Sequence, residues 1–300
     1  MEGFINVLKP PGMSSGAVVG LVKRVTGCKV GHCGTLDPEA AGILPIMVGR
    51  ATRLFDFMVE KQKTYLAEVS FGYSTDTQDA QGIALQKGDH YPDRAQVLAA
   101  AKQLTGDIMQ RPPVYSALKQ GGEPLYKLAR KGKMPQIPPR PIHVDRIDVL
   151  EETPRHGFMI RITCGRGTYI RTICQDMGEI TGCPAHMRFL LREQTGAFSL
   201  DTAVTIEQLK QAKEDGTVGD YVLPMDYPLS HMPRMDVNGW VQRLCENGVT
   251  LRPEQWPHHI APGEHTRIYA GNQFMGISRA EADGTLVPRV VLSKQEGSTN

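Results

Sequence analysis

The chain has 300 residues, enough for one large domain and a small second one with a packed core. Hydrophobic residues make up 40% of the chain and charged residues 22%, a composition typical of globular proteins that excludes the disordered and fibrous classes. The net charge is only +2, but basic residues outnumber acidic ones over 1–192 and the reverse holds over 193–300, an imbalance that permits a nucleic-acid partner without settling it.

The first predicted helix begins after Ser14 or Ser15, either of which can cap it, and runs to about Thr26. Gly27 is a suitable stop. The apolar residues spaced as on one helix face are Val18, Val22 and Val25. We interpret this helix as structural.

Two predicted strands, near 64–71 and 157–164, alternate apolar and polar residues. The apolar side chains that share a face are Tyr65, Ala67, Val69 and Phe71 in the first strand, and Phe158, Ile160, Ile162 and Cys164 in the second. Between the strands, Asp93 can cap a helix that ends before Gly106. The alternation predicts a sheet with a buried face.

The segment from Arg111 to about residue 140 is rich in proline, glycine and basic residues, and we expect a mobile excursion there. The basic residues over 111–146 are Arg111, Lys119, Lys127, Arg130, Lys131, Lys133, Arg140 and Arg146, against the acidic Glu123 and Asp145. This concentration suits a phosphate backbone, but a solvated loop has the same composition.

Two further helices are predicted after this segment. Thr168 can cap one that runs to about Thr181, and Thr205 with Gln208 forms a capping box for another. The buried side of the first consists of Ile170, Ile173, Cys174, Met177 and Ile180. Arg171 lies in its first turn, where a positive charge costs about 0.3–1 kcal/mol, so the pattern indicates a specific partner for this arginine.

After about residue 230 the sequence changes to short strand-like runs, which predict a small β-rich domain over 231–300. The runs are His265–Ala270, Gln273–Ser278 and Leu286–Leu292. Gly271-Asn272 joins the first two as a tight turn. We therefore divide the chain at 230/231.

The sequence does not support a membrane-spanning protein or a protein stabilised by disulfides. Residues 1–4 begin without a basic region followed by an apolar run, and no stretch approaches the roughly 20 apolar residues of a membrane span. The six cysteines form no C-x-x-C pair and are too sparse for a disulfide scaffold, so we expect reduced thiols. A cytoplasmic protein is the expectation.

The stretch GHCGTLDP at 31–38 concentrates two glycines, a histidine and a carboxylate. Read locally, Asp37-Pro38 is typical of a helix N-cap followed by proline at the first helical position. Its glycine spacing fits neither a phosphate-binding loop nor a dinucleotide-binding loop. Cys28, His32 and Cys33 lack the second ligand pair of a zinc site. The local residues therefore leave a structural cap and a functional carboxylate both open.

Two segments together identify a family that the chain resembles. KPPGMSS at 9–15, followed by GHCGTLDPEAAGILPIMVGRAT at 31–52, closely resembles the bacterial tRNA pseudouridine-55 synthase family in the order, type and spacing of its residues. Later segments are similar too: K-x-Y at 63–65, the basic segment that begins at Arg111, and GTYIR at 167–171. The stretch 231–300 resembles the small RNA-binding β domain of the family, with much weaker motifs.

The resemblance implies that Asp37 is the catalytic nucleophile. It also implies that Arg171 pairs with this carboxylate, keeping it ionised and oriented. Tyr65 is implied to pack against the target base at the catalytic centre, although a tyrosine at the start of a strand is more often a core or edge aromatic.

Three further residues are implied to bind the substrate together with Tyr65. His32 lies against the RNA base stack in the family and helps to splay the target uridine outward. Tyr169 and Leu190 are implied to line the substrate pocket. Leu190, read from the sequence alone, is a core residue.

The implied fold is α+β: a bent mixed β-sheet of the pseudouridine-synthase type, with flanking helices and loops, over 1–230, and a small C-terminal β-rich, PUA-like domain. The implied function is isomerisation of uridine to pseudouridine at position 55 in the T loop of tRNA. We expect no cofactor and no metal, the tRNA T stem-loop as partner, no membrane association, and a monomer.

Two alternatives stay open. A non-catalytic tRNA-binding or RNA-folding protein on the same fold would use the basic segment equally well, but the intact Asp37, Tyr65 and Arg171 argue against it. A zinc-dependent nucleobase hydrolase would require stoichiometric metal, so metal analysis of the purified protein distinguishes it.

Overall fold

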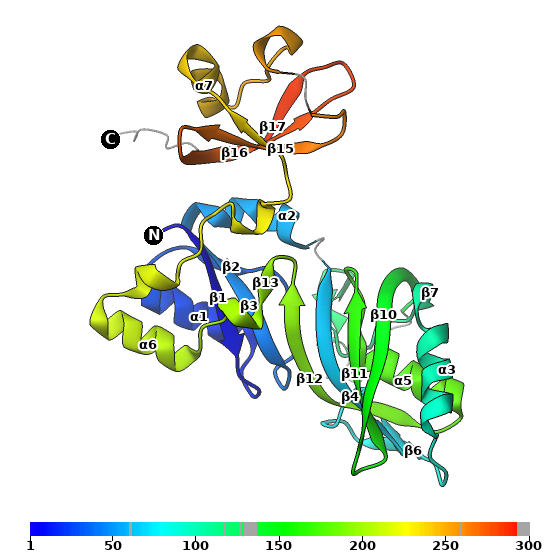
Figure 1. Ribbon diagram of the computed structural model, residues 1–300. Coiled ribbons are helices and arrows are strands. Elements are labelled where there is room, and N and C mark those ends of the chain that lie inside the picture. Colours follow the sequence, from blue (N-terminus) through cyan, green and yellow to red (C-terminus); the bar gives the residue numbers. More distant parts are fainter. Residues whose placement is uncertain (60–61, 117, 126–127, 129–136, 258–259, 293–300) are drawn as a thin grey trace.

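The protein is described here from a computed structural model, which covers residues 1–59, 62–116, 118–125, 128, 137–257 and 260–292 (Figure 1). Of the predicted basic segment, Lys127, Arg130, Lys131 and Lys133 lie outside the described residues. In the part that is described, no helix is both long and apolar enough to cross a membrane.

A mixed sheet in the order β1-β3-β12-β4-β11-β10-β7 forms the larger part of the molecule, with β2 paired to β3 and β13 to β12. Its strands are β1 (Gly3–Lys9), β2 (Val30–His32), β3 (Ala41–Val48), β4 (Lys63–Phe71), β7 (Gly106–Gln110), β10 (Arg140–Thr153), β11 (Gly157–Cys164), β12 (Ala185–Thr195) and β13 (Phe198–Ser199). Within the described strands, β3 and β12 are its only parallel neighbours.

Helices flank this sheet at both ends (Figure 1). They are α1 (Ser15–Thr26), α2 (Phe55–Val59), α3 (Arg94–Gln103), α5 (Ile170–Thr181) and α6 (Ile206–Asp215). Of these, α2 lies between this sheet and a second, smaller sheet (Figure 1). α1 contacts α6 beside β1 and β3, whereas α5 packs on β12 and β4 and contacts α3. Two short hairpins lie outside the sheet: β5 (Tyr73–Thr75) with β6 (Ala84–Lys87), and β8 (Lys119–Gln120) with β9 (Glu123–Pro124).

The alternation in the two predicted strands is confirmed. β4 and β11 pair antiparallel, with Tyr65 opposite Ile162 and Ala67 opposite Ile160. The predicted inward side chains are all buried: Tyr65, Ala67, Val69, Phe71, Phe158, Ile160, Ile162 and Cys164. These residues belong to one apolar core with the buried face of α5. The sheet is therefore fixed in register by its hydrophobic face.

Four of the predicted helix ends are confirmed. Ser14 caps α1 by accepting from the amide of Ala17, and Gly27 ends it in the left-handed conformation, at φ 67°. Reciprocal capping boxes begin the other two helices: Asp93 with Gln96 for α3, and Thr205 with Gln208 for α6.

The predicted cap of α5 is wrong. The helix begins at Ile170 after Tyr169, which makes no side-chain cap, and Thr168 lies outside it. Gln110 of β7 takes over this function: its Nε2 donates to the Tyr169 carbonyl at 3.1 Å, and its Oε1 accepts from the Tyr169 amide at 2.8 Å. A cap from a distant strand leaves no local sequence signal.

The predicted buried face of α5 is also partly wrong. Ile170, Ile173, Cys174 and Met177 are buried as predicted, but Ile180 is 38% exposed. Arg171 is only 5% exposed, although its position in the first turn is ordinarily a surface position. The buried face is therefore rotated toward Arg171.

A second sheet, in the order β14-β15-β16-β17, follows residue 230. Its strands are β14 (Arg234–Asp236), β15 (His265–Ala270), β16 (Gln273–Ala280) and β17 (Leu286–Val291), and α7 (Gly239–Glu246) accompanies them. The three predicted strands are confirmed, as is the turn between β15 and β16, where Gly271 has a φ of 57°. β14 was not predicted, and the domain boundary at 230/231 stays a prediction.

The second sheet rests on the first part of the chain next to α2 (Figure 1). Phe274 and Leu292 share an apolar cluster with Phe4 and Leu54. Arg50 donates to the Leu292 carbonyl, and Arg53 donates to the Val291 carbonyl at 2.8 Å. The two sheets are therefore joined by packing and hydrogen bonds as well as by the chain.

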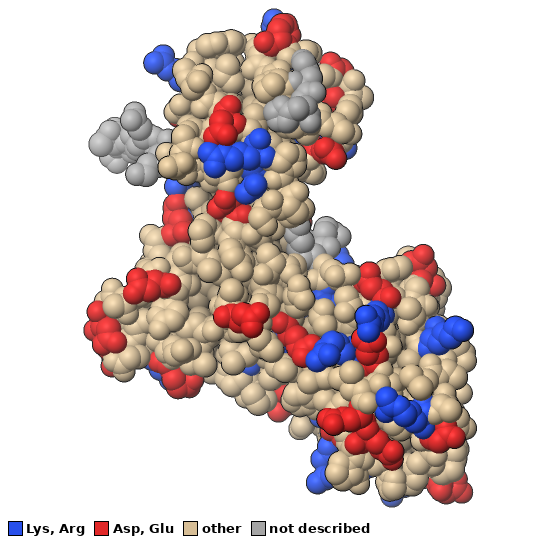
Figure 2. Space-filling view, in the orientation of Figure 1, with Lys and Arg blue, Asp and Glu red and all other residues tan. Residues whose placement is uncertain are grey.

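Charges are unevenly distributed on the face shown in Figure 2. Acidic side chains gather at the α6 end, where Glu207, Glu214, Asp215 and Asp220 lie in or next to the helix.

Candidate active site

Asp37 lies in the loop between β2 and β3, in a turn rather than at a helix end. The Ala40 amide donates to the Asp37 carbonyl at 3.1 Å, and Pro38 occupies the second position of the turn, which its fixed φ suits. The N-cap interpretation of Asp37-Pro38 is therefore wrong, and the Asp37 carboxylate is left available for other partners.

That carboxylate is held by Arg171, from the first turn of α5. Arg171 Nε lies 3.0 Å from Asp37 Oδ2, and Nη2 lies 3.4 Å from Oδ1. The Arg171 side chain is 6% exposed and the Asp37 side chain 40%, so a buried cation holds a carboxylate that faces the opening. Two-point contact of this kind fixes both the position and the orientation of a carboxylate.

Arg171 is itself fixed by three further groups. Nη1 donates to the Thr77 carbonyl at 3.1 Å, and Nη2 donates to the Tyr115 carbonyl at 2.9 Å. Asp79 Oδ2 lies 3.8 Å from Nη1. These partners offset the cost of a buried positive charge in the first turn of a helix.

Asp79 is a site residue that the sequence reasoning missed. It lies in the polar turn between β5 and β6, where its Oδ1 accepts from Thr77 Oγ1 at 2.6 Å and from the Gln81 amide at 3.0 Å. The available sequence signal was the density of polar residues over 74–82.

A cavity of about 320 Å³ opens beside the Asp37–Arg171 pair. Its walls include Tyr65 of β4, Leu190 of β12, and Tyr169 and Ile170 at the start of α5. Five of the six predicted site residues therefore line one cavity, although they come from distant parts of the sequence. Two rings and two aliphatic side chains give it the flat, apolar walls that a base requires.

The sixth predicted residue, His32, lies in a neighbouring outer cleft of about 650 Å³. This cleft also contains Thr77, Asp79 and Tyr115. The residues that line both the cleft and the inner cavity are Thr35, Leu36, Asp37, Ser116 and Arg171. We call these five residues the neck.

The titratable groups around the pair favour their uncharged forms. Burial raises the pKa of Tyr65, and the charge of Arg192 opposes that rise. Burial also raises the pKa of Tyr169, opposed by the nearby Ser116 hydroxyl and the charge of Arg171. Burial, together with the charge of Arg192, lowers the pKa of His32. Both phenols and the imidazole are therefore neutral at pH 7.

Two side chains from the N-terminal segment hold the Asp37 loop in place. Lys9, which is fully buried, donates from Nζ to the carbonyls of Pro10 at 2.9 Å, Met13 at 2.6 Å and Pro38 at 2.8 Å. Ser15 Oγ bonds both the amide and the carbonyl of Leu36 at 2.9 Å. Burial lowers the pKa of Lys9 to about 8, opposed by the charges of nearby acidic residues.

Arg192 holds the loop from the opposite side. It is 2% exposed and donates to the carbonyls of Ile43 at 2.9 Å, Gly34 at 3.2 Å and Thr35 at 3.5 Å. The sequence reasoning missed both Arg192 and Lys9. The available signal for Arg192 was a charge that follows an apolar run in a strand.

Comparison with known proteins assigns the family. The model for the N-terminal domain of TruB family pseudouridylate synthases matches residues 22–170, and the model for the C-terminal domain of tRNA pseudouridylate synthase B matches residues 171–230. The chain belongs to the TruB family. Curated relatives named tRNA pseudouridine synthase B agree: that of Alkaliphilus oremlandii is 40% identical and covers 92% of each chain, and that of Bacillus subtilis is 39% identical and covers 90% of this chain and 89% of its own.

Solved structures agree on the fold of this TruB family member. A Cbf5-Nop10-Gar1 complex contains a chain with a TM-score of 0.74 and 25% identity, covering 97% of this chain and 84% of its own. A chain of an H/ACA RNP bound to a substrate RNA containing 2′-deoxyuridine gives a TM-score of 0.75 at 23% identity, over 98% of this chain and 86% of its own. The predicted α+β fold and the assignment as a pseudouridine synthase, an isomerase, are confirmed.

Replacing Lys9 with methionine is expected to destabilise this TruB enzyme. The three carbonyls would lose their donor in a buried site, at a cost on the order of 3 kcal/mol in the free energy of unfolding. Urea denaturation measures the change. Lys23→Met on the exposed side of α1 is the matched control, expected to stay within about 0.5 kcal/mol of wild type. Equal stabilities for the two variants would contradict the role of Lys9.

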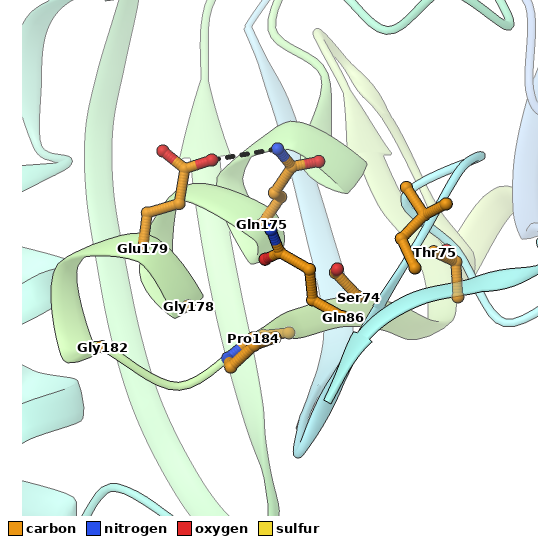
Figure 3. A pocket seen from close by; sticks show the side chains of 10 residues that line it. Ser74, Thr75, Gln86, Gln175, Gly178, Glu179, Gly182 and Pro184 are labelled. Atoms are coloured by element: carbon orange, nitrogen blue, oxygen red, sulfur yellow. Dashed lines mark hydrogen bonds between the residues drawn. The ribbon is translucent and has the colours of Figure 1, made fainter. Parts of the chain in front are cut away.

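A separate cavity of about 360 Å³ lies between the β5–β6 hairpin and the C-terminal half of α5 (Figure 3). Ser74, Gln86, Gln175 and Glu179 lie around it, and Gln175 Nε2 donates to Glu179 Oε1 at 3.0 Å. It contains none of the six site residues predicted for the TruB family fold, so it lies outside the candidate active site.

Proposed function

We propose that this enzyme isomerises the uridine at position 55 in the T loop of tRNA, with Asp37 as the catalytic nucleophile. The observation that carries the proposal is the Asp37–Arg171 pair at the neck of a cavity with flat, apolar walls. The names of the curated relatives, tRNA pseudouridine synthase B, support tRNA as the substrate.

The reaction breaks the bond between N1 of uracil and C1′ of the ribose, turns the base, and joins C5 to C1′. The proton on C5 is lost and N1 gains one, so the product is an isomer and no electrons are exchanged. Asp37 can attack the base or the sugar covalently, or abstract a sugar proton to give a glycal-like intermediate. Each route requires the carboxylate within contact distance of the target nucleotide.

Each wall of the cavity has a role in this proposal. Arg171 orients the Asp37 carboxylate. Tyr65 and Leu190 pack against the flipped uracil, and Tyr169 closes the pocket around it. Extrusion of the base from its stack costs a few kcal/mol, which these contacts offset. His32, in the outer cleft, takes the space that the target base leaves in the RNA stack.

The substrate contact extends beyond the cavity. Arg111 and Arg140 are exposed and lie where β7 and β10 adjoin the segment that carries Tyr115, and we propose that this region binds the phosphates of the T stem-loop. A monomeric state and a cytoplasmic location stay predictions. The non-catalytic alternative does not require a buried arginine to hold a carboxylate at the mouth of a cavity.

The test is release of tritium from a T-arm hairpin that carries 5-tritiated uridine, because formation of the new bond at C5 expels the label. We expect release from purified protein in the presence of a chelator and without added cofactor, and no stoichiometric metal by elemental analysis. No release from wild type would refute the proposed function, and release that stops on chelation would revive the metal-dependent alternative.

A further inference from the structure

Ser116 lies at the neck, on the segment that closes one side of it. The preceding residue, Tyr115, is bound through its carbonyl to Arg171 Nη2 at 2.9 Å, and the Ser116 amide donates to the Val114 carbonyl at 3.0 Å. Pro112 and Pro113 are buried behind this turn. The Ser116 side chain is therefore held at a fixed place beside the Asp37–Arg171 pair.

The Ser116 hydroxyl lacks a hydrogen-bond partner. Ser116 is 5% exposed, and its Oγ is one of the few buried side-chain polar atoms without a partner among the residues described. The Tyr169 phenol is the nearby group with which the Ser116 hydroxyl interacts, an interaction that opposes the rise in the pKa of Tyr169, but the contact is not a hydrogen bond of standard distance and angle. A buried hydroxyl without a partner is costly, so a ligand group at the neck would recover that energy.

Other serines around the same cleft already have partners. Ser15 Oγ bonds the backbone of Leu36, and Ser14 Oγ accepts from the Ala17 amide as the cap of α1. Thr168 Oγ1 in the inner cavity also has no partner among the described residues, but of these two hydroxyls only that of Ser116 belongs to a residue that also lines the outer cleft. Ser116 marks the position where the inner cavity and the outer cleft meet.

The part of the substrate at this position follows from the chemistry of Asp37. Because that carboxylate must reach the glycosidic bond or an atom next to it, the ribose of the target nucleotide lies at the neck. We place the uracil beyond the neck, between Tyr65 and Leu190 of the inner cavity. Within an RNA strand the 3′ and 5′ oxygens of the ribose are in phosphodiesters, so its one free hydroxyl is at C2′.

We propose that the Ser116 hydroxyl hydrogen-bonds the 2′-hydroxyl of the target nucleotide and so selects ribose over deoxyribose at that position. A 2′-hydroxyl is both donor and acceptor, and it is the group that distinguishes RNA from DNA. This inference rests on the proposed function, because it takes the target ribose to lie beside Asp37.

A thermodynamic cycle tests the proposal. T-arm hairpins with either uridine or 2′-deoxyuridine at the target position are bound to the Asp37→Asn protein, in which turnover does not interfere, with and without Ser116→Ala. We expect the deoxy substitution to weaken binding about two- to tenfold when Ser116 is present and to have little effect in the Ser116→Ala protein. Ser116→Thr, which keeps a hydroxyl, is expected to retain the preference for ribose.

Ser14→Ala is the matched control, because it removes a hydroxyl from the same cleft that already has a partner. The effects of Ser14→Ala and of the deoxy substitution on the free energy of hairpin binding are expected to be additive. The assignment of Ser116 would be overturned if the losses of binding free energy from Ser116→Ala and from the deoxy substitution were additive, or if neither change weakened binding. Tritium release by the wild-type protein is measured alongside. If no tritium is released, the proposed function fails. If tritium is released but Ser116→Ala does not reduce the preference for ribose, only this inference is rejected.

Discussion

Asp37→Asn is expected to abolish turnover of a T-arm hairpin, lowering kcat by at least about a thousandfold, while the hairpin still binds. Asparagine is nearly isosteric with aspartate but carries no negative charge, so it is neither an effective nucleophile nor a base. The loop is expected to keep its shape, because Lys9, Ser15 and Arg192 hold it through backbone groups next to residue 37. Tritium release under single-turnover conditions gives the rate, and filter binding gives the affinity.

Asp56→Asn is the control for this substitution. Asp56 is an exposed carboxylate on α2, and its replacement is expected to leave the rate within about twofold of wild type. Turnover by Asp37→Asn close to that of Asp56→Asn would remove Asp37 from its proposed role. Loss of RNA binding together with turnover would indicate a damaged site instead of a missing nucleophile.

Arg171→Met is expected to have the second largest effect, a fall in kcat of about 10²–10³-fold together with lower stability. The substitution leaves Asp37 and Asp79 without their shared cation and leaves two backbone carbonyls, of Thr77 and Tyr115, without a donor. Because Arg171 is buried, water replaces these contacts poorly, and we expect a loss of about 3–5 kcal/mol in the free energy of unfolding. Single-turnover rates and urea denaturation measure the two losses separately.

The control here is Arg161→Met. Arg161 also pairs with a carboxylate, Glu193, at 2.8 Å, but its side chain is 43% exposed. Exposed pairs contribute at most about 1 kcal/mol, so this variant is expected to keep near-normal stability and turnover. Arg171→Lys keeps the positive charge but lacks the planar guanidinium group that binds a carboxylate through two N–H donors. Compared with Arg171→Met, we expect this variant to recover more of the lost stability than of the lost rate. A fast Arg171→Met enzyme would contradict the orienting role.

Local patterns in the sequence predicted most of the regular structure because their causes are local. The alternation over 64–71 and 157–164, and the capping residues Ser14, Asp93 and Thr205, each act within a few residues of the element that they define. The strands around Gly271-Asn272 were predictable for the same reason.

The site was only partly predictable because it is assembled from contacts between distant segments. The cap of α5 comes from Gln110, and the partners of Arg192 lie about 150 residues away along the chain, at Gly34, Thr35 and Ile43. A buried charge appears in the sequence only as an ordinary basic residue, since what permits its burial is a set of carbonyls from other elements. Asp37 itself was identifiable through family resemblance, whereas its local pattern indicated a helix cap.

The apolar cluster that joins Phe4 to Leu292 gives the molecule a property that neither sheet has alone. Because the second sheet is packed against the first, the distance from Asp37 to the far surface of β15 and β16 is set by packing between the two sheets and not by a flexible linker. Any ligand that touches both surfaces at once must therefore match a fixed span.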